Sequence, residues 1–206
     1  MTTPIDVDYP FAGDWLVQNS PADRIPSHGT ELFASSYAID FVPVVGGRSA
    51  PFTVRSLFRP EEAERFPGFG RSVLAPANAI VLATHDHEPD HAAYLGIPSI
   101  GYALTQRSRI AQGWQALAGN HVILQSGSSY IALCHLQRAS ILVRPGQHMR
   151  SGDQIGRCGN SGNSTEPHLH VQAFDNPNVE LAHPVALTFN GSIPHNGEIV
   201  HSQLHE

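Results

Sequence analysis

Two histidines, His168 and His170, stand two residues apart after a polar turn rich in Gly, Asn and Ser. In a strand, side chains alternate between faces, so both imidazoles would point the same way while Leu169 points to the other. Neutral imidazole binds transition metals and exchanges protons near neutral pH. The pair therefore suits metal binding, proton transfer, or one of each. Because the chain has 13 histidines, such a pair also arises by chance on the solvent face of a half-buried strand.

Three further residues are candidates for the same chemistry: His28, Asp40 and His135. A catalytic zinc site needs about three protein ligands, an open position for water, and groups that move protons. Asp40 lies in the alternating segment 37–42, so it should project away from Ile39 and Phe41. His135 ends the apolar segment 130–136, and Cys134 beside it should face the other way.

The elements that must position these residues are mainly short strands. Charged residues make up only 15% of the chain, and its 18 Gly and 16 Pro favour many turns. We expect a mostly β, antiparallel domain with an active-site groove. Segments 121–124, 130–136, 154–156 and 168–174 are predicted strands, and segments 72–76 and 79–83 are predicted to form a hairpin.

The 206 residues predict one main domain. We expect an irregular N-terminal arm over residues 1–25 with a short strand at 15–18, a catalytic domain over 26–190, and a polar tail over 191–206. Residues 84–118 interrupt the β pattern and are predicted to be a partly helical insertion that forms a wall or lid of the groove. Gly113 weakens the helical pattern within it.

The net charge of −6 argues against a nucleic-acid surface, which requires clustered Lys and Arg. No apolar run reaches the 18 or more residues of a membrane span. Residues 1–10 lack the basic and apolar parts of a secretory leader, which indicates a cytoplasmic protein as written, or an extracytoplasmic one whose leader was removed. Cys134 and Cys158 are expected to be reduced and buried, although one bridge between them is possible. No particular oligomeric state is predicted.

The motifs from Gly119 to His170 resemble the lysostaphin-type (LytM-like) zinc metallopeptidases, which cut peptidoglycan peptides. They comprise segments 119–124, 133–136, 143–156 and 159–170. The resemblance implies that His28, Asp40 and His170 hold Zn²⁺ and that His135 and His168 assist catalysis. The expected function is hydrolysis of a peptide bond, with peptidoglycan cross-link or stem peptides as the substrate. His28 departs from the family pattern, because it precedes Asp40 by twelve positions rather than by the usual short spacing.

Three rival hypotheses remain at this point. The segment 85–91 is similar to the metal motif of metallo-β-lactamase-fold hydrolases, but it is one residue too long. His85, His87 and His91 there are expected to lie on a polar loop, with incidental or regulatory metal binding as a minor alternative. Two histidines and one carboxylate also form the ligand set of non-haem iron oxygenases. The third hypothesis is a catalytically silent binding or regulatory module of the same fold.

Overall fold

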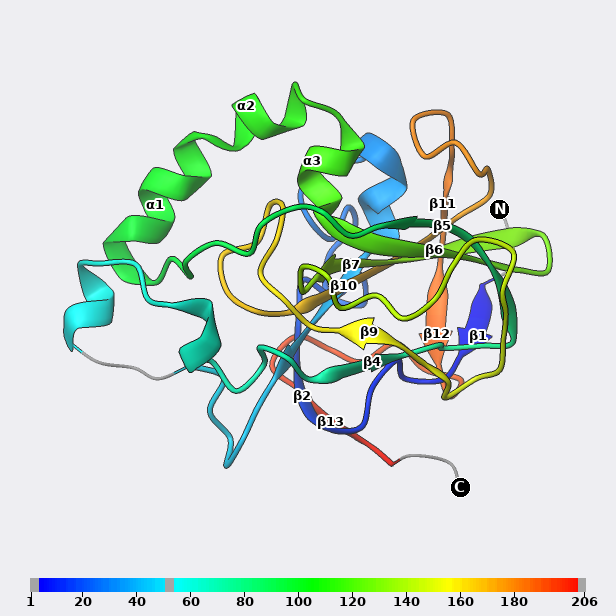
Figure 1. Cartoon of the computed structure of the whole chain (residues 1–206), viewed down its shortest axis with the longest axis horizontal. Helices are drawn as coiled ribbons and strands as arrows, with labels where there is room; N and C mark the ends of the chain where they lie inside the picture. Colours follow the sequence, from blue (N-terminus) through cyan, green and yellow to red (C-terminus); the bar gives the residue numbers. More distant parts are fainter. Residues whose placement is uncertain (1–3, 51–53, 204–206) are drawn as a thin grey trace.

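The computed structural model describes residues 4–50 and 54–203 and contains a nine-stranded sheet (Figure 1). Its strand order is β13-β2-β3-β10-β7-β6-β5-β8, with β11 beside β10, and all these pairs are antiparallel. The strands of this sheet are β2 (Gly13–Gln18), β3 (Ile39–Pro43), β5 (Ala79–His85), β6 (Asn120–Ser126), β7 (Ser129–Leu136), β8 (His148–Met149), β10 (Leu169–Phe174), β11 (Pro184–Val185) and β13 (Ile199–Ser202).

Two small sheets accompany the large one. The strands β1 (Ile5–Val7) and β12 (Leu187–Phe189) pair in parallel, and β4 (Ser72–Leu74) pairs with β9 (Gln154–Arg157) in antiparallel fashion. Their apolar side chains share one core with one face of the large sheet. This core contains Ile39 and Phe41 of β3 together with Leu169 and Val171 of β10. Alternation therefore sends Asp40 and His170 to the opposite face.

The opposite face carries a smaller apolar cluster and the helices. The helices are α1 (Gly96–Leu104), α2 (Gln106–Ile110) and α3 (Trp114–Ala118), which follow one another in an arc at the upper left of Figure 1. Gly113 separates α2 from α3 with a φ of 89°, a conformation that glycine adopts without strain. Three 3₁₀ segments complete the fold: Leu32–Tyr37, Val54–Leu57 and Ala63–Arg65.

The expectation of a mostly β, antiparallel fold is confirmed. In the expected arm, β2 contains the strand expected at 15–18. The structure adds β1 in the arm and β13 in the tail, and β13 pairs with β2. Residues 1–3 and 204–206 of those segments lie outside the described residues. The domain bounds themselves stay a prediction.

The predicted hairpin of residues 72–83 is wrong. Its first strand, β4, pairs with β9, and its second, β5, pairs with β6 and β8. Alternation identifies a strand but not its partner, and here both partners are distant in sequence. Cys134 and Cys158 are free and buried, as expected. Among the described residues, no helix has the length and apolar character needed to cross a membrane.

Candidate metal centre

Two neighbouring strands bring Asp40 and His170 together. In the antiparallel register of β3 and β10, His170 lies directly opposite Asp40. Nδ1 of His170 lies 2.9 Å from Oδ1 of Asp40, and the carboxylate is only 4% exposed. Both side chains are thus fixed by the backbone ladder of the sheet.

His28 reaches the same carboxylate from a loop. Its Nε2 lies 3.0 Å from Oδ2 of Asp40, although the two residues are twelve positions apart. The Ser27 N–H donates to the carbonyl of Ser36 at 3.0 Å, which ties this turn to the 3₁₀ segment before β3. Gly29, with a φ of 71°, allows the chain to turn immediately afterwards.

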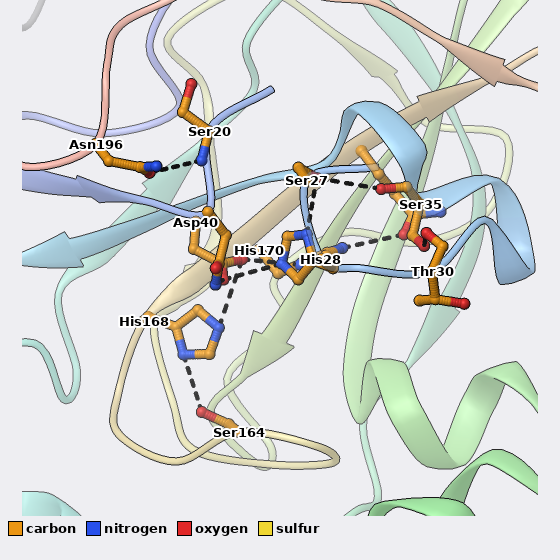
Figure 2. Close-up of polar contacts among 12 residues, drawn as sticks. Ser20, Ser27, His28, Thr30, Ser35, Asp40, Ser164, His168, His170 and Asn196 are labelled. Atoms are coloured by element: carbon orange, nitrogen blue, oxygen red, sulfur yellow. Dashed lines mark hydrogen bonds and ion pairs between the residues drawn. The ribbon is translucent and has the colours of Figure 1, made fainter. Parts of the chain in front are cut away.

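The ligand atoms of His28, Asp40 and His170 all lie within 4.8 Å of one another (Figure 2). Burial by itself would raise the pKa of the Asp40 carboxyl, but His28, His168 and the hydrogen bond from His170 outweigh it and hold this pKa well below its usual range. A buried, ionised carboxylate between two imidazoles is a donor set that suits a divalent zinc ion. The structure thus gathers the three predicted ligands, and their role as ligands stays a prediction.

The two predicted catalytic histidines lie beside this group. The His168 and His135 ring centroids are 4.7 Å apart, and Nε2 of His168 lies 3.7 Å from Oδ1 of Asp40. Nδ1 of His168 is 2.8 Å from the carbonyl of Glu166, and Nδ1 of His135 is 2.9 Å from the carbonyl of Ser161. A neutral ring that donates from Nδ1 in this way keeps the Nε2 lone pair available.

His135 reaches the site through a bulge. The pairing of β6 with β7 shifts between Asn120 and Val122. His135 has a φ of 63°, a rare backbone conformation for a residue other than glycine. Bulges redirect side chains near active sites. Cys134 and His135 consequently line the same cavity, so the expectation that they face opposite ways is wrong. Burial, followed by the neighbouring His168 and His170, holds the pKa of His135 well below its usual range, so this ring is neutral at pH 7.

Two supporting residues were missed from the sequence. Nε2 of His170 lies 3.0 Å from Oε1 of the buried Gln172, whose Nε2 donates to the carbonyl of Phe33 at 2.9 Å. When a metal takes the place of the Nδ1 proton that faces Asp40, Gln172 would accept the remaining Nε2–H and keep the ring in place. Asn19 donates to Oδ2 of Asp40 at 2.7 Å. Because Gln172 stands two residues after His170 in β10, strand alternation predicts that the two side chains share a face.

The site opens into a cavity of about 260 Å³. Its wall is formed in part by α2 and α3, which supports the prediction that the 84–118 insertion borders the groove. Besides the five candidate residues and Cys134, the cavity is lined by Asn19, Thr30, Leu32, Phe33, Ser35, Tyr102, Arg109, Ile110, Trp114, Leu117, Ala118, Asn163, Thr165 and Gln172.

The polar turn before His168 is fixed by close backbone packing. Gly162, with a φ of 70°, lies so near Gly119 that an added Cβ would be 2.4 Å from the Gly119 nitrogen. Ser161 Oγ donates to the carbonyl of Leu136 at 2.8 Å and accepts from the Asn120 N–H at 3.0 Å. The turn is thereby joined to β6 and β7, which places both His135 and His168.

Residues of the rival motif at 85–91 hold this turn in place. Both carboxylate oxygens of Asp90 accept backbone N–H groups, from Asn160 at 2.7 Å and from Arg138 at 2.9 Å. Nε2 of His91 lies 3.0 Å from the carbonyl of Gly162. His87 is exposed, and its ring lies 5.9 Å from that of His85. Within residues 4–50 and 54–203, these histidines do not form a group with metal-ligand spacing.

Comparison with known proteins gives matches that cover parts of the chain. A 55-residue stretch is 44% identical to the peptidoglycan DD-endopeptidase ShyA of Vibrio cholerae, covering 27% of this chain and 13% of that protein. A 90-residue stretch is 33% identical to peptidoglycan DD-endopeptidase ShyC of the same organism, covering 42% and 19%. The chain thus spans less than a quarter of the length of either relative.

Among solved structures, the catalytic domain of lysostaphin from Staphylococcus simulans is 16% identical over 72% of this chain and 74% of that one, with a TM-score of 0.41. The sequence profile described as Peptidase family M23 matches residues 103–180. That range contains His135, His168 and His170, and the predicted resemblance to the lysostaphin-type peptidases is confirmed. Residues 103–180 of this chain are thus similar to Peptidase family M23.

Proposed function

We propose that this protein is a zinc-dependent endopeptidase that hydrolyses a peptide bond in peptidoglycan cross-link or stem peptides. The observation that carries the proposal is the convergence of His28, Asp40 and His170 within 4.8 Å, beside two further histidines in one cavity. The family match and the names of the two Vibrio relatives support the reaction class.

In this proposal His28, Asp40 and His170 hold zinc. Two imidazoles and one carboxylate leave room for water in a tetrahedral site, as catalytic zinc requires. Bound zinc polarises a carbonyl and lowers the pKa of its water to about 7 from 15.7. The two extra histidines favour hydrolysis over the oxygenase alternative, because proton-transfer groups beside the ligands serve hydrolysis.

The protein's own groups would move the protons. His135 and His168 each direct Nδ1 to a backbone carbonyl, and each lines the cavity. The Nε2 atom of one ring would orient or deprotonate the attacking water, and that of the other would protonate the leaving amine or stabilise the oxyanion. His135 is neutral at pH 7, and with Nδ1 directed to the carbonyl of Ser161 it presents Nε2 as a hydrogen-bond acceptor.

The substrate follows from the relatives, whose names specify peptidoglycan. A peptidoglycan substrate would place the working protein outside the cytoplasm. A cavity flanked by the apolar side chains of Ile110, Trp114 and Leu117 suits a peptide substrate.

The test is incubation of the zinc-loaded protein with purified muropeptides and with short Gly-rich or D-Ala-containing peptides, followed by mass spectrometry. We expect products that differ from the substrate by one hydrolysed peptide bond, and none with the His168→Ala variant. Binding without cleavage would instead support the silent module. Iron in place of zinc in the purified protein would contradict the proposed chemistry.

A further inference from the structure

Arg109 of α2 lines the same cavity as His168 and His170. Among the described residues that line this cavity, it is the sole lysine or arginine. It lies in the 84–118 insertion, away from the five residues that the sequence singled out. A fixed positive charge at this place would face any substrate that enters the cavity.

The guanidinium of Arg109 is held firmly in position. Its carbon lies 3.8 Å from the ring centroid of Tyr102, so the planar group packs over the aromatic face. Nε donates to Oδ1 of Asn163 at 2.7 Å, Nη1 donates to Oγ1 of Thr105 at 2.7 Å, and Nη2 donates to the carbonyl of Tyr102 at 2.8 Å. Tyr102 is itself anchored, because its hydroxyl donates to the carbonyl of Gly162 at 2.8 Å.

All three of these acceptors are neutral. Arg65, by comparison, forms an ion pair with Glu61, whereas no ion pair of Arg109 occurs in the part of the chain that the structure describes. A guanidinium has five N–H donors. Within the described residues, one N–H on each of Nη1 and Nη2 therefore has no protein acceptor, and these are the two nitrogens that bind a carboxylate in bidentate fashion.

We propose that Arg109 is a specificity-determining residue that binds a carboxylate of the peptide substrate. The carboxylate would come from a chain terminus or from an acidic side chain near the scissile bond. A monoanion suits the site better than a phosphate dianion, because the cavity provides one arginine and already contains the Asp40 carboxylate. The inference rests on the proposed peptidase function and specifies its substrate class.

The test compares matched peptides. One pair differs only in a C-terminal carboxylate or carboxamide, and a second pair differs only in a Glu or Gln side chain. With wild-type protein we expect kcat/KM to favour the acid in one pair by about 10- to 100-fold, the range for one charge-assisted bidentate contact. The Arg109→Gln variant should bring this ratio close to one, because it slows cleavage of the acid more than cleavage of the neutral peptide.

Two controls separate recognition from structural support. Arg109→Lys keeps the charge and should retain part of the preference, and Arg144→Gln, at an exposed arginine that is not part of the cavity lining, should retain all of it. If Arg109 only supports the turn at Asn163, its replacement would slow cleavage of acid and neutral peptides equally. That result, or a wild-type ratio of one for both pairs, would overturn the inference.

Calorimetric binding of the same peptides to the metal-free wild type and to the metal-free Arg109→Gln variant distinguishes this inference from the proposed function. An Arg109-dependent preference for the acid, without any cleavage by zinc-loaded protein, would support the carboxylate subsite and contradict the peptidase activity. Cleavage without such a preference would support the peptidase activity and contradict the subsite.

Discussion

Two groups of histidines in this protein each lie near one carboxylate, yet they differ in how that carboxylate is held. In the first group, Asp40 is 4% exposed, and His28, His168 and His170 surround it. In the second, His85 lies 3.3 Å from a Glu88 side chain that is 45% exposed. A buried carboxylate needs hydrogen-bonding partners, and here the imidazoles converge on it. An exposed carboxylate is solvated by water, so imidazoles near it need not converge.

The two groups also differ in the contacts that hold their histidine rings. Ring nitrogens of the first group face Ser27, Gln172 and the carbonyl of Glu166, and these contacts orient each ring toward Asp40. In the second group His121 stacks on His85 with centroids 5.5 Å apart, and its Nδ1 lies 2.7 Å from the carbonyl of Gly119. The second group therefore packs against neighbouring rings rather than as a set of ligands around its carboxylate.

Replacement of the central carboxylate should have the largest effect. The Asp40→Asn variant keeps the side-chain shape but removes the negative charge that a zinc ion would neutralise. We expect hydrolysis to disappear. Zinc affinity should fall by more than the factor of about 10 to 100 that is typical when a residue hydrogen-bonded to a metal ligand is replaced. Competition with a chromophoric chelator measures this affinity. The matched Glu88→Gln variant should bind zinc like the wild type, and equal losses in both variants would contradict the contrast.

Gln172→Ala should have the next largest effect, because it frees His170 to change tautomer. We expect zinc affinity to fall by about 10- to 100-fold. Gln172→Glu retains an acceptor for Nε2 of His170 and should recover much of the affinity, although it cannot donate to the carbonyl of Phe33. An alanine variant with unchanged affinity would show that Gln172 only fills space.

The second group should affect how the free energy of unfolding depends on pH in acid. Burial, together with nearby His85, lowers the pKa of His121 to about 4 despite its hydrogen bond to Gly119. Since the unfolded value is near 6.5, the unfolded chain binds the proton first, and stability falls as the pH decreases from about 6.5 to 4. The loss amounts to about 3 kcal/mol.

The His121→Asn variant retains a donor for the Gly119 carbonyl and cannot titrate. Urea unfolding at a series of pH values should therefore show a difference between wild type and variant that changes by about 3 kcal/mol across this window. Parallel stability curves for the two proteins would refute a buried neutral His121.

The smallest effect is expected for His87→Ala. This exposed side chain lies outside the cavity lining, so activity should stay within about 2-fold of wild type and stability within about 0.5 kcal/mol. Steady-state hydrolysis and thermal unfolding check both values. A large loss of activity would revive the metal hypothesis for residues 85–91.

Strand alternation predicted that Asp40 and His170 each project away from the apolar side chains of their own strand, and the structure places both on the face opposite the core. Their exact opposition in the register of β3 and β10 was not predictable, since alternation does not identify the partner of a strand. The same ambiguity produced the wrong hairpin at residues 72–83. His28 was predicted through the family resemblance, and the turn that returns it to Asp40 depends on tertiary hydrogen bonds.

Other features had weaker signals. The bulge at His135 arises from an unequal count of residues between β6 and β7, which a strand pattern does not record. Arg109 lies on a helix of five residues, too short for a periodic pattern, and its place in the cavity is set by contacts with Tyr102 and Asn163. Sequence periodicity predicts which side chains share a face, but not which distant segments meet.

Zinc content after gel filtration tests the central claim most directly. We expect one zinc ion per chain in the wild type, none in the His170→Ala variant, and one in the matched His85→Ala variant. Zinc retained after replacement of His170, or lost after replacement of His85, would contradict the assignment of the metal centre to His28, Asp40 and His170.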